Sequence, residues 1–157
     1  MELCKTFRFE ASHILPKHPG KCSRLHGHSW VLHVFVEGKV NPDTGFVMDY
    51  ADMSAAVKPL VERLDHRHLG AWHAKVEKGS IFDYLPYQEE WAVPGLPRDF
   101  YPSSENLLLW IGSQLYGPRV GHPFLSWSKL ALEETCTSRA EVDVVEYLES
   151  IGKATRI

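Results

Sequence analysis

Alternation of apolar and polar positions near the start of the chain predicts two β-strands. Residues 5–14 place Phe7, Phe9 and His13 on one face and polar side chains on the other, which is the period of a half-buried strand. Residues 28–37 are rich in β-branched and aromatic side chains and predict a second strand. His13 therefore ends an apolar face.

Two further strands are predicted near the end of the chain, over residues 124–134 and 140–148. In the first of these, Glu134 shares a face with Leu130 and Leu132, whereas the preceding glutamate lies on the opposite face. A glutamate on the same strand face as two leucines is unusual, because that face is otherwise apolar. We therefore treat Glu134 as a candidate ligand-binding group.

Apolar residues at helical spacing predict two helices between the strand pairs. Asp49 is the expected N-cap of the first helix, Pro59 is expected to kink it, and the segment LDHRHLG is expected to close it. Ser103 or Ser104 is the expected cap of the second helix, which ends before a Gly-Pro pair. The order strand, strand, helix, helix, strand, strand predicts an α+β fold with an antiparallel sheet.

The 157 residues form one expected domain, without internal repeats or a convincing boundary. Residues 71–101 have little regular pattern but carry seven aromatic side chains, which is too aromatic for a disordered linker. We expect this segment to be a packed excursion between the two helices.

Composition and charge argue against a nucleic-acid-binding protein and against a membrane protein. The chain is 44% hydrophobic and 24% charged, and its net charge of −3 lacks the basic surplus of a typical nucleic-acid binder. No apolar stretch approaches membrane-spanning length, and charged residues interrupt any signal-like run at the start. Three cysteines, an odd number, fit a reduced cytoplasmic setting. We therefore expect a cytoplasmic protein that binds neither nucleic acid nor membrane.

Nine histidines stand out, and three of them could form a metal site. If residue 26 already belongs to the second strand, His26 and His28 project to the same side. His13 from the first strand would supply a third nitrogen and leave a fourth position open, as in catalytic zinc sites. The spacing alone leaves open a polar turn that binds no metal. The second H-x-H pair, His66 and His68, is the weaker candidate because it lies at an expected helix end.

Two other groups could carry chemistry. Cys22 follows Lys21 and precedes Arg24 in a polar loop, and these positive charges favour a thiolate that could act as a general base. Asp65 and His66 form an acid–imidazole pair. Taken alone, that pair is better explained by a histidine stabilised at a helix C-terminus.

Six short motifs, in this order, resemble the 6-pyruvoyl-tetrahydropterin synthase / 6-carboxytetrahydropterin synthase family: FRFEASHIL, KCSRLHGHSW, TGFVMDYADM, RLDHRHL, PSSENLLLWI and LEETCT. The resemblance covers most of the chain except residues 71–101, which look like an insertion between the helices. It implies a tunnelling fold (T-fold), in which a four-stranded antiparallel sheet carries two helices on one face. It also implies that three subunits close a barrel and that two barrels stack into a homo-hexamer.

The resemblance implies a role for each matching residue. It implies one Zn²⁺ per subunit, bound by His13, His26 and His28. Cys22 would accept a proton, and Asp65 and His66 would form a charge-relay pair. Glu134 would hold the pterin ring and belong to the same catalytic set. Ser103 and Ser104 would contribute hydroxyl contacts near the ring, although a helix cap is the simpler role.

The C-x-x-x-H-G-H spacing is similar to that of the carboxytetrahydropterin synthases of queuosine (7-deazaguanine) biosynthesis. The implied reaction converts 7,8-dihydroneopterin triphosphate to 6-carboxy-5,6,7,8-tetrahydropterin, with release of acetaldehyde and triphosphate. Two alternatives stay open. One is a 6-pyruvoyl-tetrahydropterin synthase, which only eliminates triphosphate, and the other is a non-catalytic zinc-binding module.

Overall fold

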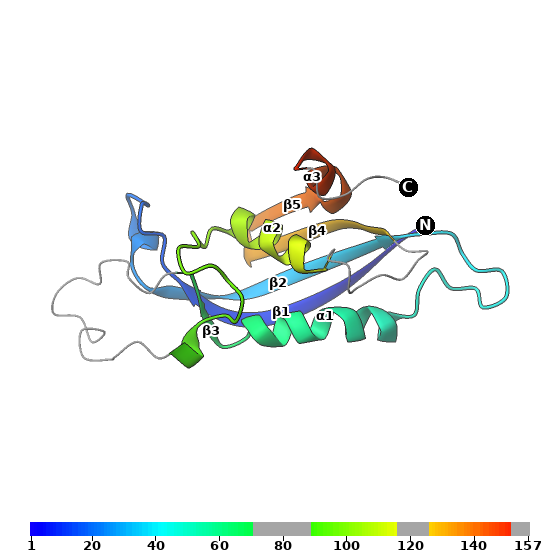
Figure 1. Ribbon diagram of the computed structural model, residues 1–157, viewed down its shortest axis with the longest axis horizontal. Helices are drawn as coiled ribbons and strands as arrows, with labels where there is room; N and C mark the ends of the chain where they lie inside the picture. Colours follow the sequence, from blue (N-terminus) through cyan, green and yellow to red (C-terminus); the bar gives the residue numbers. More distant parts are fainter. Residues whose placement is uncertain (71–88, 116–125, 152–157) are drawn as a thin grey trace.

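The computed structural model describes residues 1–70, 89–115 and 126–151. Four strands pair antiparallel, as the alternation predicted, and a fifth short strand lies parallel to the first. The sheet order is β3-β1-β2-β4-β5 (Figure 1). The strands are β1 (Glu2–His13), β2 (His26–Glu37), β3 (Arg67–Leu69), β4 (Ser126–Thr135) and β5 (Ser138–Asp143).

The parallel strand β3 was not expected from the sequence, which placed these residues at a helix end. Helix α1 (Tyr50–Leu64) stops earlier, and His66 takes a φ of +55° that turns the chain alongside β1. A three-residue strand is too short to show a period in the sequence. The sheet is therefore mixed and five-stranded, although its four long strands are the predicted antiparallel set.

The expected helix caps are present. The Asp49 carboxylate accepts the Ala51 amide at 2.7 Å and begins α1, which continues through Pro59. Ser103 Oγ accepts the Asn106 amide at 3.3 Å and precedes α2 (Ser104–Leu115). The Gly-Pro pair expected to end α2 lies outside the described residues.

The expected strand over residues 140–148 was wrong in its second half. Strand β5 ends at Asp143, whose carboxylate accepts the Glu146 amide at 2.8 Å and begins helix α3 (Val144–Ser150). Val144 and Leu148 are both buried. They lie one helical turn apart, a spacing that also fits strand alternation over so short a segment.

One core lies between the sheet and the three helices. Figure 1 shows α1 running along β1, with α2 and α3 near β4 and β5. Phe9 and Trp30 stack on this face, with ring centroids 6.1 Å apart. Most of the segment expected to form an aromatic excursion, residues 71–88, lies outside the described residues. Its remainder includes the 3₁₀ turn η3 (Glu89–Trp91) and the buried Val93.

Candidate functional site

Three histidines meet where β1 and β2 join at one end of the sheet. In the register of the two strands His13 faces His26, and Ala11 faces His28. All three side chains therefore lie on the helix-covered face, as the period of two predicted. Gly27 lies between the paired histidines, and a Cβ there would come within 3.3 Å of the Ala11 carbonyl oxygen. The glycine thus permits close packing of the strands beside the cluster.

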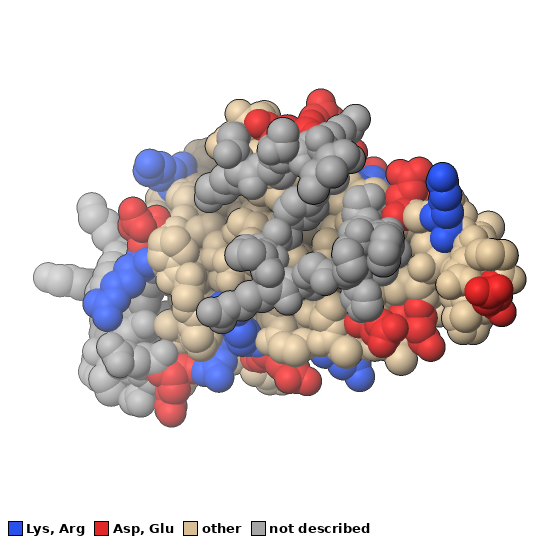
Figure 2. All heavy atoms as spheres, turned by 45° about the vertical axis from the view of Figure 1, so that its right-hand side comes forward, with Lys and Arg blue, Asp and Glu red and all other residues tan. Residues whose placement is uncertain are grey.

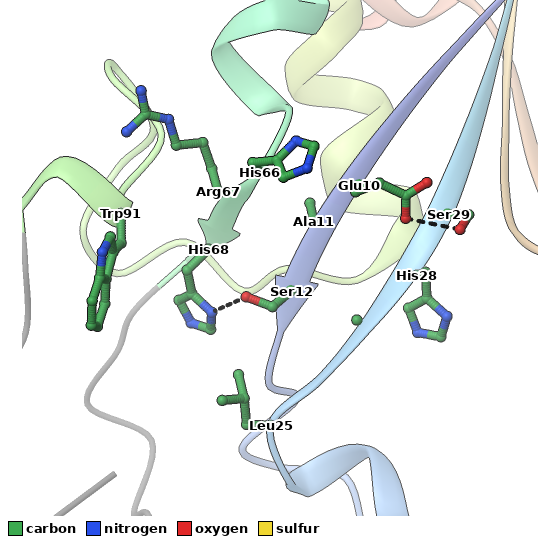
Figure 3. Close-up of a pocket in the computed structure, with 11 residues that line it drawn as sticks. Glu10, Ala11, Ser12, Leu25, His28, Ser29, His66, Arg67, His68 and Trp91 are labelled. Atoms are coloured by element: carbon green, nitrogen blue, oxygen red, sulfur yellow. Dashed lines mark hydrogen bonds between the residues drawn. The ribbon is translucent and has the colours of Figure 1, made fainter. Parts of the chain in front are cut away.

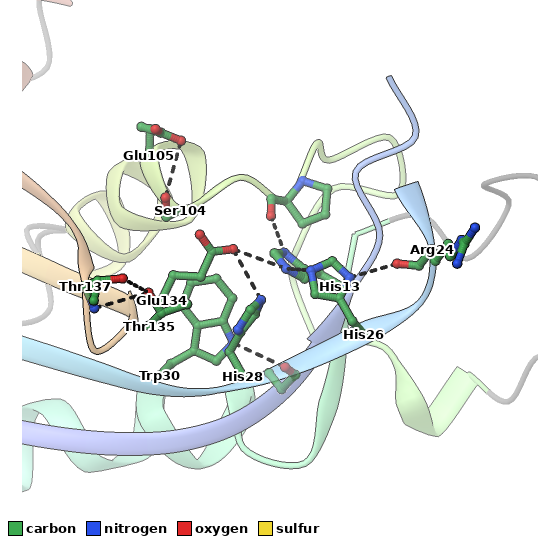
Figure 4. Close-up of polar contacts among 12 residues, drawn as sticks. His13, Arg24, His26, His28, Trp30, Ser104, Glu105, Glu134, Thr135 and Thr137 are labelled. Carbon is green, nitrogen blue, oxygen red and sulfur yellow. Dashed lines mark hydrogen bonds and ion pairs between the residues drawn. The ribbon is translucent and has the colours of Figure 1, made fainter. Parts of the chain in front are cut away.

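The imidazole nitrogens of these residues converge. His13 Nε2 lies 3.0 Å from His26 Nε2, and one ring nitrogen from each of the three histidines lies within 4.8 Å of the others. Among the histidine, cysteine and carboxylate side chains of the described residues, these three histidines form a group whose geometry could hold a metal ion. Figure 4 shows the rings gathered at the end of β2.

Main-chain carbonyl groups set the tautomers of two of these rings. His13 Nδ1 lies 2.7 Å from the Pro102 oxygen, and His26 Nδ1 lies 2.8 Å from the Arg24 oxygen (Figure 4). A carbonyl oxygen only accepts, so each Nδ1 carries the hydrogen, and in the neutral form that binds a metal each ring directs an Nε2 lone pair toward the other. Two lone pairs facing each other at 3.0 Å repel unless a cation lies between them.

His13 is a poor place for a proton at neutral pH. Burial lowers the pKa of His13 to about 4, and the neighbouring histidines contribute to the lowering. Burial also lowers the pKa of His28. Zinc bonded to imidazole at about 2.0–2.1 Å in tetrahedral geometry separates its ligand nitrogens by roughly 3.3 Å. The three residues therefore fit a zinc ion, with two ring orientations already fixed by backbone contacts.

Glu134 borders the histidine cluster from β4. Its Oε1 atom lies 3.3 Å from His13 Nε2 and 3.5 Å from His28 Nε2, and its side chain is 24% exposed. Glu133 lies on the opposite face, where its carboxylate contacts His33 Nε2 at 2.8 Å. The strand period thus distinguished the two glutamates correctly.

Asp65 and His66 form a hydrogen-bonded pair at the other side of β1. His66 Nδ1 lies 2.8 Å from one oxygen of Asp65, and the other oxygen accepts the Glu10 amide at 2.8 Å. The His66 amide donates to the Glu10 carbonyl oxygen at 2.6 Å. The Glu10 amide and His66 hold the pKa of Asp65 below its usual range. The carboxylate is therefore positioned to orient the exposed imidazole of His66.

A polar hollow of about 430 Å³ lies beside this pair (Figure 3). His66 and His28 are both among the residues that line it, whereas Asp65, His13 and His26 are not. Trp91 and the hydrogen-bonded residues Ser12 and His68 also line it. The sequence pattern indicated His68 only as a weaker metal ligand and did not single out Ser12 or Trp91 for a site. Ser12 stands within a quoted motif, but nothing in the linear pattern pairs it with His68.

The other candidate residues from the sequence are Cys22, Ser103 and Ser104. Cys22 is half-buried in the 3₁₀ turn η1 (Lys21–Ser23), and its carbonyl oxygen accepts the Leu15 amide at 2.9 Å. It is not among the residues that line the polar hollow. Ser103 and Ser104 follow Pro102, which contacts His13, and the structure assigns Ser103 the cap of α2. The roles of these three residues stay predictions.

The surface agrees with the charge analysis. In the view of Figure 2 acidic and basic side chains are interspersed over the described surface. In the described ranges no helix combines the length and the apolar character that a membrane span requires.

Residues 2–144 match the family described as 6-pyruvoyl tetrahydropterin synthase. The chain is 36% identical to the 6-carboxy-5,6,7,8-tetrahydropterin synthase of Synechocystis sp. over 141 residues, covering 87% of this chain and 88% of that one. It is 35% identical to the protein of the same name from Haemophilus influenzae, covering 89% and 96%.

Solved structures share the fold. The 6-pyruvoyl tetrahydropterin synthase of Caenorhabditis elegans superposes with a TM-score of 0.62 at 22% identity, covering 91% of this chain and 94% of that one. The enzyme of the same name from Plasmodium vivax gives 0.65 at 20% identity, covering 90% and 96%. The expected α+β T-fold is confirmed. With a family match over nearly its whole length, the chain belongs to the 6-pyruvoyl tetrahydropterin synthase family of enzymes.

Proposed function

We propose that this protein is a zinc-dependent 6-carboxytetrahydropterin synthase. The substrate would be 7,8-dihydroneopterin triphosphate, and the products would be 6-carboxy-5,6,7,8-tetrahydropterin, acetaldehyde and triphosphate. Relatives of that name that match most of the chain support this choice over the pyruvoyl-forming alternative. The observation that carries the proposal is the cluster of His13, His26 and His28, with two Nε2 lone pairs directed at each other.

His13, His26 and His28 would hold the zinc ion. When bound, Zn²⁺ supplies a Lewis acid that polarises the oxygen atoms of the substrate side chain. The Pro102 and Arg24 carbonyl groups keep the His13 and His26 rings oriented for this purpose. Burial keeps His13 neutral at physiological pH, which is the form that binds a metal.

The chain's own residues would move the protons. Cys22 as a thiolate would remove a carbon-bound proton from the side chain, and triphosphate would leave by elimination. Asp65 would orient His66 through the 2.8 Å contact, so that His66 transfers the second proton. Water would then add to the side-chain carbonyl carbon next to the ring, and cleavage of the adjacent carbon–carbon bond in a retro-aldol-like step would leave the carboxyl group on the ring and expel acetaldehyde.

Glu134 would bind the pterin ring. An ionised carboxylate matches the two N–H donors on the amidine-like edge of the ring with a bidentate contact. Its position 3.3 Å from His13 Nε2 would set the ring beside the metal. Ser103 and Ser104 would add hydroxyl contacts, since Pro102 brings their segment to His13.

Product identification with zinc-loaded protein and 7,8-dihydroneopterin triphosphate tests the proposal. We expect acetaldehyde and 6-carboxy-5,6,7,8-tetrahydropterin in equal amounts. Turnover to a pyruvoyl product without acetaldehyde would favour 6-pyruvoyl-tetrahydropterin synthase activity instead. Stoichiometric zinc without any turnover would favour the non-catalytic zinc-binding module.

The setting and assembly are also proposals. The C-x-x-x-H-G-H spacing supports a place in queuosine biosynthesis, and three free cysteines support a cytoplasmic location. The exposed apolar side chains of Met1, Phe46 and Tyr50 support assembly into the homo-hexamer that the resemblance implies. Light scattering coupled to size-exclusion chromatography should give six times the mass of the 17.9 kDa chain.

A further inference from the structure

A four-residue stretch of β1 connects the acid–imidazole pair with the histidine cluster. Glu10 is bonded through its backbone to Asp65 and His66, whereas His13 belongs to the histidine cluster. Between these two ends, Ser12 pairs with His68 of β3 in the strand register. Ser12 and His68 therefore lie where β1 meets the segment that carries the acid–imidazole pair.

Ser12 and His68 are joined by their side chains as well as by the register. Ser12 Oγ lies 3.0 Å from His68 Nδ1, and the His68 side chain is buried with 4% of the residue exposed. Figure 3 shows this contact within the polar hollow, with the ring of His68 between Ser12 and Trp91. A buried imidazole is stabilised by such a partner, so the contact fixes the ring against β1.

The backbone between these contacts is strained. His66 holds a φ of +55°, a region that residues with a Cβ rarely occupy. Such a conformation persists only when surrounding contacts enforce it. The Glu10 contacts enforce it from one side, and the attachment of β3 enforces it from the other.

We propose that Ser12 and His68 are positioning residues for the Asp65–His66 pair. Their hydrogen bond holds β3 against β1, keeps His66 in its strained conformation and directs the imidazole into the polar hollow. The inference rests on the proposed function in taking His66 as a proton-transfer group. Ser12 lies on the face opposite His13, and its hydroxyl contacts His68 rather than one of the metal ligands.

The experiment compares Ser12→Ala with wild-type protein in zinc-loaded and cobalt-substituted forms. We expect kcat to fall roughly tenfold, as for lost supporting contacts at other sites, with KM for 7,8-dihydroneopterin triphosphate and the Co²⁺ absorption spectrum unchanged. Ser12→Thr retains the hydroxyl and should restore kcat. In a His66→Ala background the Ser12→Ala change should lower kcat less than twofold, because the two residues act together.

Hydrogen exchange gives a readout that does not depend on turnover. Peptides that contain residues 65–69 should exchange faster in Ser12→Ala, and those that contain residues 29–36 should not. The matched control is Ser128→Ala, which removes another interstrand hydroxyl contact, 3.3 Å from Glu2, at the far end of the sheet. It should leave kcat and the exchange of residues 65–69 as in wild type.

The outcomes are separable. Unchanged exchange at residues 65–69, full additivity with His66→Ala, failure of Ser12→Thr to restore kcat, or a shifted Co²⁺ spectrum would each overturn the positioning role. If wild-type protein makes no pterin product, the proposed function fails. The exchange data then still decide whether the contact holds the 65–69 segment.

Discussion

Acidification should destabilise the metal-free protein through its two buried histidines. Burial lowers the pKa values of His13 and His68 from 6.5 to about 4. Both rings therefore stay neutral in the folded state at pH 5, whereas in the unfolded chain they are almost fully protonated. The unfolded state then binds more protons, so the free energy of unfolding falls as the pH falls from 7.5 toward 4.

The size of the effect follows from the pKa values. With a folded pKa of about 4 and an unfolded value of 6.5, each histidine removes about 2 kcal/mol of stability at pH 5, or about 4 kcal/mol for the pair. This is a large share of the 5–15 kcal/mol that is typical for a folded protein. Asp65 adds an effect of the same sign only at lower pH, because its pKa is held below its ordinary value of 3.8.

Urea unfolding of EDTA-treated protein at pH 7.5 and pH 5.0, at fixed protein concentration, measures this difference. His68→Phe keeps a ring at this position but removes the titrating group, so it should reduce the pH-dependent loss by about 2 kcal/mol. A loss in His68→Phe equal to that of wild type would refute the reasoning. So would a protein that becomes more stable on acidification.

Three substitutions test the remaining assignments. His28→Ala should lose both zinc, measured by elemental analysis, and turnover, because two imidazoles bind the ion far more weakly than three. Cys22→Ala should keep stoichiometric zinc but lose at least a hundredfold in kcat, in the range by which proton-transfer groups accelerate reactions. Glu134→Gln should raise KM for 7,8-dihydroneopterin triphosphate about tenfold or more, since the charged contact to the ring is lost.

Matched controls come from neighbouring positions. His33→Ala removes a histidine from the same strand, on the face opposite the cluster, and should leave the zinc content unchanged. Cys136→Ser removes an exposed thiol, and Glu133→Gln removes the glutamate adjacent to Glu134. If a control matches its test variant, the corresponding assignment is wrong.

The sequence predicted the parts of the fold that have a clear period. Strands of ten to twelve residues show enough alternation to place His13, His26 and His28 on one face and to separate Glu134 from its neighbour. Asp49 also predicted the start of α1 correctly, because an N-cap residue is recognised from its immediate neighbours in the chain. These features depend on residues that are close in the chain.

Other features were beyond sequence reasoning because they depend on distant or main-chain groups. Strand β3 has only three residues, and its attachment requires the unusual turn at His66. Ser12 and His68 are 56 positions apart, and nothing in either segment identifies the other as its partner. The switch from β5 to α3 depends on the cap at Asp143, within a run whose apolar spacing fits both structures.

The two carbonyl groups that orient His13 and His26 belong to the main chain of residues 102 and 24. Any amino acid that preserves the path of the chain can supply such an oxygen. The side chain of Arg24 is therefore not needed for this contact, whereas Pro102 is buried and also packs beside Gly70. A search restricted to side chains would overlook both of these contacts.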